Sequence, residues 1–161
     1  MSVAVNIQSF IKNKLEEFNI SRKQFIQESG ISSSVVSGLL NAMRVNPTLK
    51  CLIKIANYFN CTIDEVLGRK HYSVPLDIDK TMTYNDIVNN IYDYIRCRLE
   101  AQNITANKLS QLCGIGENTI LKSLKEHKTK GNLGTKSLVA IADYFDVSID
   151  DMAKRLIHNK D

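Results

Sequence analysis

The chain has 161 residues, of which 43% are hydrophobic and 24% are charged, and its formal net charge is +4. These values describe a globular protein with modest cores, and no apolar run reaches the roughly 20 residues that a membrane span needs. The first residues lack the basic and apolar segments of a secretory signal, so we expect a cytoplasmic protein that binds no membrane.

Residues 1–41 contain the pattern of three helices. Apolar residues recur at spacings of three and four over residues 6–18, which predicts an amphipathic first helix. Ser21 is a suitable N-cap for a short second helix that ends at Gly30 in a left-handed cap. Ser32 or Ser33 then caps a third helix that extends to about Asn41. Two helices joined by such a tight turn form a helix-turn-helix motif.

Two more helices complete the first part of the chain. Pro47 interrupts the helical pattern, and Thr48 caps a fourth helix whose apolar residues face a core. Thr62 caps a short fifth helix. We therefore predict a first domain over residues 1–69. Residues 70–82 contain Pro75 and several polar residues and are predicted to form a linker, of which the extended stretch 74–78 either packs on a domain or stays free.

Residues 83–161 repeat this plan and predict a second domain. Thr83 and Asp86 have the spacing of a capping box before a longer first helix. Thr105 caps the second helix, and Gly114 makes the turn to a third helix over residues 117–125. A fourth helix is expected over about residues 135–145, and a fifth after Ser148.

The two copies agree in their framework and differ in their third helix. Residues 15–31 and 99–115 share seven identities in 17 positions, and residues 50–65 and 136–151 share eight in 16. Residues 32–39 and 116–123 share none, although apolar Val36 is matched by Ile120. Such internal repetition indicates two small domains of one fold, with a different exposed surface on each third helix.

The spacing of these residues resembles the lambda-repressor and Cro-like helix-turn-helix family, often called Xre. In the first copy the matching positions are Ser21, Phe25, Gly30, Ile31, Val36, Leu40, Pro47, Thr48, Ile55, Ala56, Phe59 and residues 62–67. In the second copy they are Leu99, Thr105, Leu109, Gly114, Ile115, Ile120, Leu124, Leu138, Ile141, Ala142, Phe145 and residues 147–150. The resemblance implies an all-α chain of two five-helix domains in tandem, joined by a linker, which binds double-stranded DNA.

The resemblance also implies roles for individual residues, because the third helix reads bases in the major groove in this family. The implied base-reading residues are Ser33, Ser34, Ser37, Gly38 and Asn41 in the first copy and Glu117, Asn118, Leu121, Lys122 and Lys125 in the second. The implied phosphate contacts are Arg22, Lys23, Arg44, Asn107, Lys108, Lys128 and Lys130. The second copy is the more basic one, since five lysines and one acid lie between Lys122 and Lys136.

This chain departs from the family at the starts of two helices. Family members commonly carry glutamine at the start of the second and third helices, where this chain has Arg22 and Ser33, then Ala106 and Glu117. Glutamine contacts to adenine are therefore not expected, and serine hydroxyls discriminate weakly between bases. Glu117 either accepts a hydrogen bond from a cytosine amino group or stabilises the N-terminus of its helix.

Two functions from different classes remain open. The first is a sequence-specific transcriptional regulator. The resemblance implies a repressor, because members of this family commonly repress. The second is a protein-interaction module, antitoxin-like or an adaptor, which is motivated by the weakly charged face of Ser33, Ser34, Ser37 and Gly38. Apolar residues near the C-terminus, Ile149, Met152, Leu156 and Ile157, either form a homodimer interface or cover the local core.

Neither a cofactor nor an enzymatic activity is expected. The four cysteines form no CxxC pair and no cluster with the spacing of a zinc site, so we expect free thiols: Cys51, Cys61, Cys97 and Cys113. The histidines lie in predicted linker, loop and tail segments without a nucleophile or a paired acid nearby: His71, His127 and His158.

Overall fold

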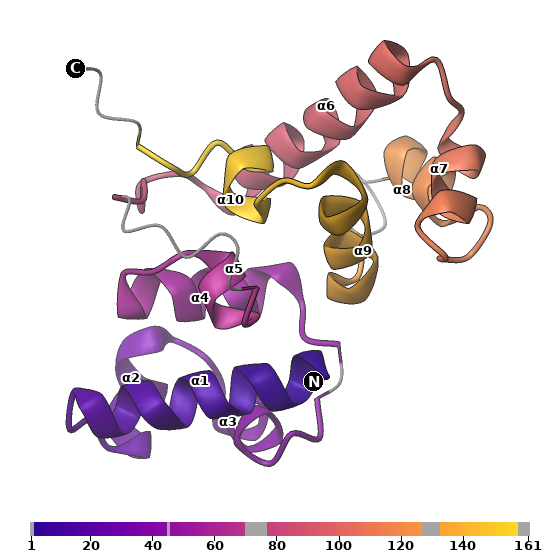
Figure 1. The fold of residues 1–161 in the computed structure, drawn as a ribbon. Helices are drawn as coiled ribbons and strands as arrows, with labels where there is room; N and C mark the ends of the chain where they lie inside the picture. The colour runs from indigo at the N-terminus through magenta and orange to yellow at the C-terminus, as the bar shows by residue number, and fades with distance from the viewer. Residues whose placement is uncertain (1, 45, 70–76, 127–132, 158–161) are drawn as a thin grey trace. The chain divides into compact units, whose positions relative to one another are not determined.

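The computed structural model describes residues 2–44, 46–69, 77–126 and 133–157, and ten helices lie within these residues (Figure 1). The chain divides into two compact units, residues 1–80 with 157–161 and residues 81–156. Each unit holds five helices, which confirms the predicted all-α class with two helix-turn-helix domains in tandem.

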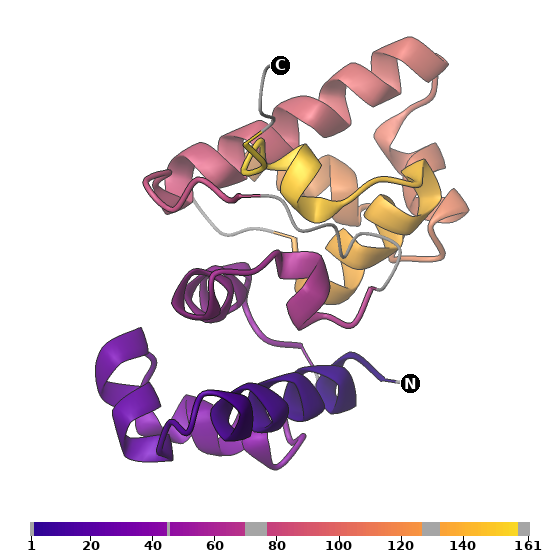
Figure 2. The same ribbon diagram turned by 60° about the vertical axis from the view of Figure 1, so that its left-hand side comes forward.

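The first unit consists of α1 (Val3–Glu17), α2 (Arg22–Ser29), α3 (Ser33–Leu40), α4 (Leu49–Phe59) and α5 (Ile63–Val66). Helix α1 packs against α3 and α5, while α4 packs against α2 and α5, so α1 and α4 enclose the core (Figure 2). The predicted caps Ser21, Thr48 and Thr62 each accept a hydrogen bond from the expected backbone N–H. Helix α1 begins three residues earlier than predicted, because Ser2 caps it.

The second unit consists of α6 (Tyr84–Gln102), α7 (Ala106–Leu112), α8 (Thr119–Glu126), α9 (Thr135–Phe145) and α10 (Ile149–Met152). The capping box of Thr83 and Asp86 is present, and Thr105 and Ser148 cap their helices as predicted. Helix α8 begins at Thr119, two residues later than predicted. The N–H of Thr119 donates to the Gly116 carbonyl at 2.9 Å, so Glu117 and Asn118 lie in a turn before the helix.

Aromatic rings fill the core of the first unit. Phe59 stacks on Phe25 with ring centroids 5.4 Å apart and meets the edges of Phe10 and Tyr58. In the second unit Phe145 takes the place of Phe59, and the guanidinium of Arg98 lies 5.8 Å from its centroid. The Tyr-Phe pair recurs at the end of the fourth helix in both units, but it is less buried in the second, where Tyr144 is 38% exposed and Phe145 is half-buried.

A buried ion pair closes each unit. The Asp64 carboxylate accepts a hydrogen bond from Arg69, and the Asp150 carboxylate accepts one from Arg155. Both carboxylates are fully buried, as is the Arg155 side chain. The backbone N–H of each arginine also donates to the carbonyl of its own aspartate at 2.9 Å. The pair therefore fixes the turn that follows the short fifth helix.

The apolar residues considered for a dimer interface are largely occupied in the fold. Ile149 and Met152 have no exposed surface, and α10 packs against α6 and α9. Leu156 is half-buried, and Ile157 is 45% exposed. Ile149 and Met152 therefore cover the core, which was the second of the two interpretations. Ile78 is also buried, whereas residues 74–76 of the predicted linker lie outside the described residues.

The free thiols occupy both the interior and the surface. Cys51 and Cys61 are buried, Cys113 is half-buried and Cys97 is exposed. Burial raises the pKa of the Cys51 and Cys113 thiols, which keeps them protonated at neutral pH. Cys51 and Cys61 are therefore free thiols in the interior of the first unit.

We predict that Asp150→Asn lowers the free energy of unfolding by about 3–5 kcal/mol, because it removes the carboxylate that pairs with the fully buried Arg155 side chain. Urea titration followed by circular dichroism measures the change. The matched control is Asp93→Asn, which breaks the exposed ion pair with Arg96 and should cost less than about 1 kcal/mol. Equal effects of the two substitutions would show that the buried pair does not close the second unit.

A second prediction concerns Tyr58, whose hydroxyl donates to the Glu28 carboxylate at 2.6 Å and joins α4 to α2. Desolvation and then this hydrogen bond raise the pKa of Tyr58 to about 12. The unfolded chain loses the phenol proton near pH 10. The stabilisation of the folded state by the protonated Tyr58 hydroxyl is therefore complete below about pH 10 and is lost as the pH rises through 12.

The measurement compares the wild type with Tyr58→Phe in urea titrations from pH 8 to pH 11. The stability difference between them should shrink as the pH rises above about 10. Glu28→Gln should retain part of this pH dependence, because desolvation is the larger cause of the pKa shift. A stability difference that stays constant from pH 8 to pH 11 would contradict the raised pKa of Tyr58.

Candidate nucleic-acid interface

The turn between α2 and α3 has the same construction as the turn between α7 and α8. Gly30 has a φ of 65° and Gly114 a φ of 66°, a left-handed conformation that side chains with a Cβ rarely adopt. The next residue, Ile31, is only 5% exposed and packs into the core. The two glycines therefore let the chain reverse within a few residues and set α3 and α8 against the preceding helices.

Helix α3 is held from its inner side. Val36 and Leu39 are buried, and Gln8 of α1 donates its side-chain N–H to the Leu40 carbonyl at 2.7 Å. This carbonyl is one of the last four of the helix and has no partner within it. Because the inner face is fixed, the outer face is presented to solvent. Of the predicted base-reading residues, Ser33, Ser34 and Asn41 are exposed, and Ser37 is half-buried.

Helix α8 is held by a different set of side chains. Arg96 of α6 donates to the Leu124 carbonyl at 3.2 Å, and the buried Ser110 hydroxyl accepts a hydrogen bond from the Ile120 N–H at 3.4 Å. The Tyr92 hydroxyl bonds to the Ser123 side chain and accepts a hydrogen bond from the Leu133 N–H at 2.9 Å. These bonds fix the whole of α8 from the core side.

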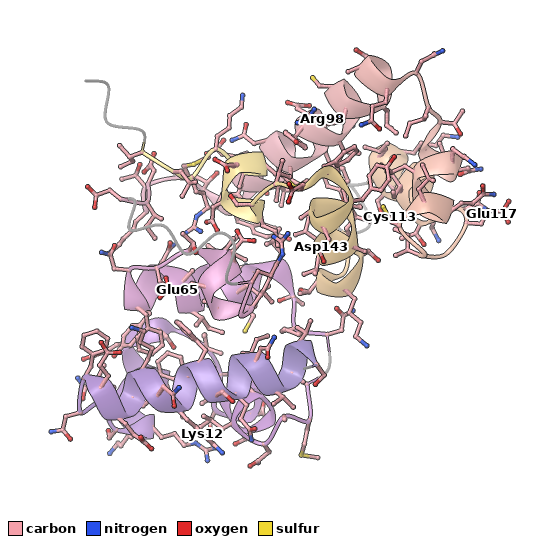
Figure 3. The ribbon with its side chains drawn as sticks, viewed as in Figure 1. Lys12, Glu65, Arg98, Cys113, Glu117 and Asp143 are labelled. Carbon is pink, nitrogen blue, oxygen red and sulfur yellow. The ribbon has the colours of Figure 1, made fainter. Side chains whose placement is uncertain are left out.

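Of the predicted base-reading residues of the second unit, Leu121 is half-buried and the other four are exposed: Glu117, Asn118, Lys122 and Lys125. Figure 3 shows Glu117 at the outer edge of this unit, in the turn that precedes α8. Because it lies before the helix, Glu117 reaches solvent from the turn. Lys122 and Lys125 extend from α8 itself and supply its exposed positive charge.

Of the predicted phosphate-binding residues, Asn107 is half-buried, and the other six divide into three groups. Lys23 and Lys108 are exposed in the first turns of α2 and α7, as a backbone contact requires. Lys128 and Lys130 lie outside the described residues. Arg22 and Arg44 are exposed but lie against α3, since Arg22 donates to the Ser37 hydroxyl and the Arg44 side chain crosses Gly38. The structure thus brings Arg22 together with a predicted base-reading residue.

The sequence did not indicate a cleft of about 370 Å³ at the surface of the first unit, between α3 and the start of α4. Three basic side chains line it, those of Arg44, Lys50 and Lys54. Lys54 donates to the Gly30 carbonyl at 2.6 Å, which secures the turn between α2 and α3. One signal of this basic cleft was available in the sequence. Lys50 lies just after the helix cap at Thr48, where its charge adds to that of the free backbone N–H groups.

Neither a metal centre nor a membrane segment is found in the part of the chain that the structure describes. There, no three His, Cys, Asp or Glu side chains are grouped so that they could hold a metal ion. None of the helices described is both long and apolar enough to span a bilayer.

Comparison with known proteins agrees with this geometry. Residues 11–66 match the helix-turn-helix family model, and residues 94–155 match the Cro/C1-type HTH DNA-binding domain. An uncharacterised HTH-type transcriptional regulator of Rickettsia prowazekii (strain Madrid E) is 38% identical over 73 residues, which are 44% of this chain and 79% of the relative.

A second uncharacterised HTH-type transcriptional regulator, from Rickettsia conorii (strain ATCC VR-613 / Malish 7), is 37% identical over 73 residues. The match covers 44% of this chain and 67% of that protein. No solved structure matches the chain significantly. The two family matches cover both helix-turn-helix motifs, and the chain belongs to the Cro/C1-type helix-turn-helix family of DNA-binding regulators.

Proposed function

We propose that the protein is a sequence-specific transcriptional regulator that represses by occupying double-stranded DNA, with α3 and α8 each in a major groove. The observation that carries the proposal is the common construction of these two helices. Side chains of the first helix of each unit hold a carbonyl near the end of the recognition helix, while its outer face stays exposed. A helix fixed in this way can present its outer side chains to base edges.

The proposed contacts follow from this orientation. In the first unit Ser33, Ser34, Ser37 and Asn41 face bases, and Lys23 faces phosphate. In the second unit Asn118, Lys122 and Lys125 approach the DNA, and Lys108 holds the backbone. Glu117 contributes sequence preference only where a cytosine amino group faces it, because a carboxylate near phosphates is otherwise unfavourable.

The two units offer different reading surfaces on one chain. Because the third helices share no identical residue over 32–39 and 116–123, the proposed binding site is asymmetric or consists of unlike half-sites. Both units belong to one chain, so both can engage one duplex where its half-sites lie ~34 Å apart, one turn of DNA. Tethering also raises the effective concentration of the second unit at its half-site to roughly the millimolar range.

The first prediction from this function concerns salt. Several contacts between cations and phosphates should make the affinity for DNA fall steeply with salt, with a slope of about −0.9 per phosphate contact in log affinity against log salt. Fluorescence anisotropy with duplexes selected from a random pool measures this slope. Absence of binding to every duplex at low salt would refute the regulator and favour a protein-interaction module.

A further prediction concerns the charge of α8. Lys122→Ala combined with Lys125→Ala should weaken DNA binding and reduce the magnitude of the salt slope by about 2, since two cations are removed. Ser34→Ala combined with Asn41→Ala should mainly change the preferred sequence. The charge-matched control is Lys12→Ala combined with Lys80→Ala, two exposed lysines outside α3, α8 and their flanks. If the α8 variant binds like this control, the second unit is not the main electrostatic anchor.

A further inference from the structure

We propose that Arg22 and Arg44 determine the sequence specificity of the first unit by each reading a guanine, although neither residue belongs to α3. The inference rests on the proposed DNA-binding function and deepens it. It follows from contacts of the two arginines with two successive small residues of α3. Arg22 donates a hydrogen bond to Ser37, and the Arg44 side chain lies against Gly38.

Arg22 approaches α3 from the start of α2. Its Nη2 donates to the Ser37 hydroxyl, which lies in the middle of the reading helix. A guanidinium has five N–H donors in a planar fork, so one bond to serine orients the group and leaves the others available. The Arg22 side chain is exposed, and no carboxylate forms an ion pair with it among the described residues.

Arg44 approaches α3 from the turn that follows it. Its backbone N–H donates to the Gly38 carbonyl at 3.2 Å, and its side chain passes over the Gly38 Cα. A Cβ added at Gly38 would lie 2.8 Å from Arg44 Cγ and 3.2 Å from Arg44 Nε. Glycine inside a helix is destabilising, and the backbone at Gly38 does not require it. The space that it leaves is filled by Arg44.

The chemistry of the surface favours arginine as the reading group. The α3 residues Ser33, Ser34 and Ser37 offer hydroxyls, which bind to either base type and discriminate weakly. An arginine fork matches the O6 and N7 acceptors of guanine, and this is the commonest specific contact in the major groove. Among the side chains at α3, Arg22 and Arg44 are therefore the groups that can select guanine.

The second unit shows the converse arrangement and supports the assignment. There Leu121 and Lys122 occupy the positions of Ser37 and Gly38, and the buried Ala106 occupies the position of Arg22. In that unit the cation extends from the helix itself, and the first residue of the preceding helix, Ala106, carries no charge. Each unit thus places a cation at the middle of its reading helix, from the flanks in the first and from α8 in the second.

The test is selection of duplexes from a random pool by the full-length chain and by its Arg22→Lys and Arg44→Lys variants. Lysine keeps the charge but lacks the fork, so each variant should lose the preference for guanine at one position of the site by about 5- to 100-fold. Lys23→Ala, on the same helix as Arg22, is the matched control and should weaken binding to all sequences equally.

Gly38→Ala separates specificity from folding. Alanine favours the helix, so the thermal unfolding temperature should stay the same or rise. The added methyl group displaces the flexible Arg44 side chain, and the guanine preference at the Arg44 position should fall as in Arg44→Lys.

Unchanged selected sequences in both lysine variants would overturn the inference and leave the regulator function intact. A wild-type chain that binds no duplex at low salt would overturn the proposed function, and the inference with it.

Discussion

The arrangement of each unit depends on hydrogen bonds that side chains of the first helix donate to carbonyls at the ends of two other helices. In the first unit Gln8 holds the Leu40 carbonyl at the end of α3, and Asn6 holds the Leu67 carbonyl after α5. In the second unit Arg96 holds Leu124 in α8, and Asn90 holds Ala153 after α10. Helix ends expose carbonyls without partners, and buried ones must be satisfied. The first helix of each unit therefore fixes both the third helix, α3 or α8, and the end of the unit.

The two units satisfy one of these carbonyls with the same residue of the repeat and the other with different residues. Asn6 and Asn90 occupy the same position of the repeat and make the same bond, at 2.9 and 3.0 Å. Gln8 and Arg96 come from different turns of the first helix, yet they reach carbonyls at equivalent positions. Because α3 and α8 are held at backbone carbonyls and through buried side chains, their exposed side chains are not needed to fix them. This separation explains how the third helices differ at every position from 32 to 39 while the framework stays recognisable.

Local signals in the sequence predicted the fold, and contacts between distant side chains limited the prediction of the site. Ser21, Thr48, Thr62 and Thr105 were predicted as caps because capping depends on residues three positions apart. The Asp150–Arg155 pair spans five residues across a turn, a spacing that no helical periodicity marks. The bond of Arg22 to Ser37 joins two helices whose relative positions are set by the core. For the same reason the outer face of α3, judged weakly charged from its own residues, has two arginines against it in the structure.

The arginines at α3 and the lysines on α8 differ in how firmly they are held, and this affects what each unit would contribute to DNA binding. Arg22 is oriented by its bond to Ser37, and Arg44 is confined by its passage over Gly38, so both guanidinium groups have restricted geometry. Lys122 and Lys125 are exposed point charges on flexible stems, which tolerate many positions of a phosphate or a base. An oriented fork discriminates between bases, whereas a mobile point charge attracts any duplex. Under the proposed function the first unit therefore supplies most of the sequence preference, and the second supplies most of the affinity.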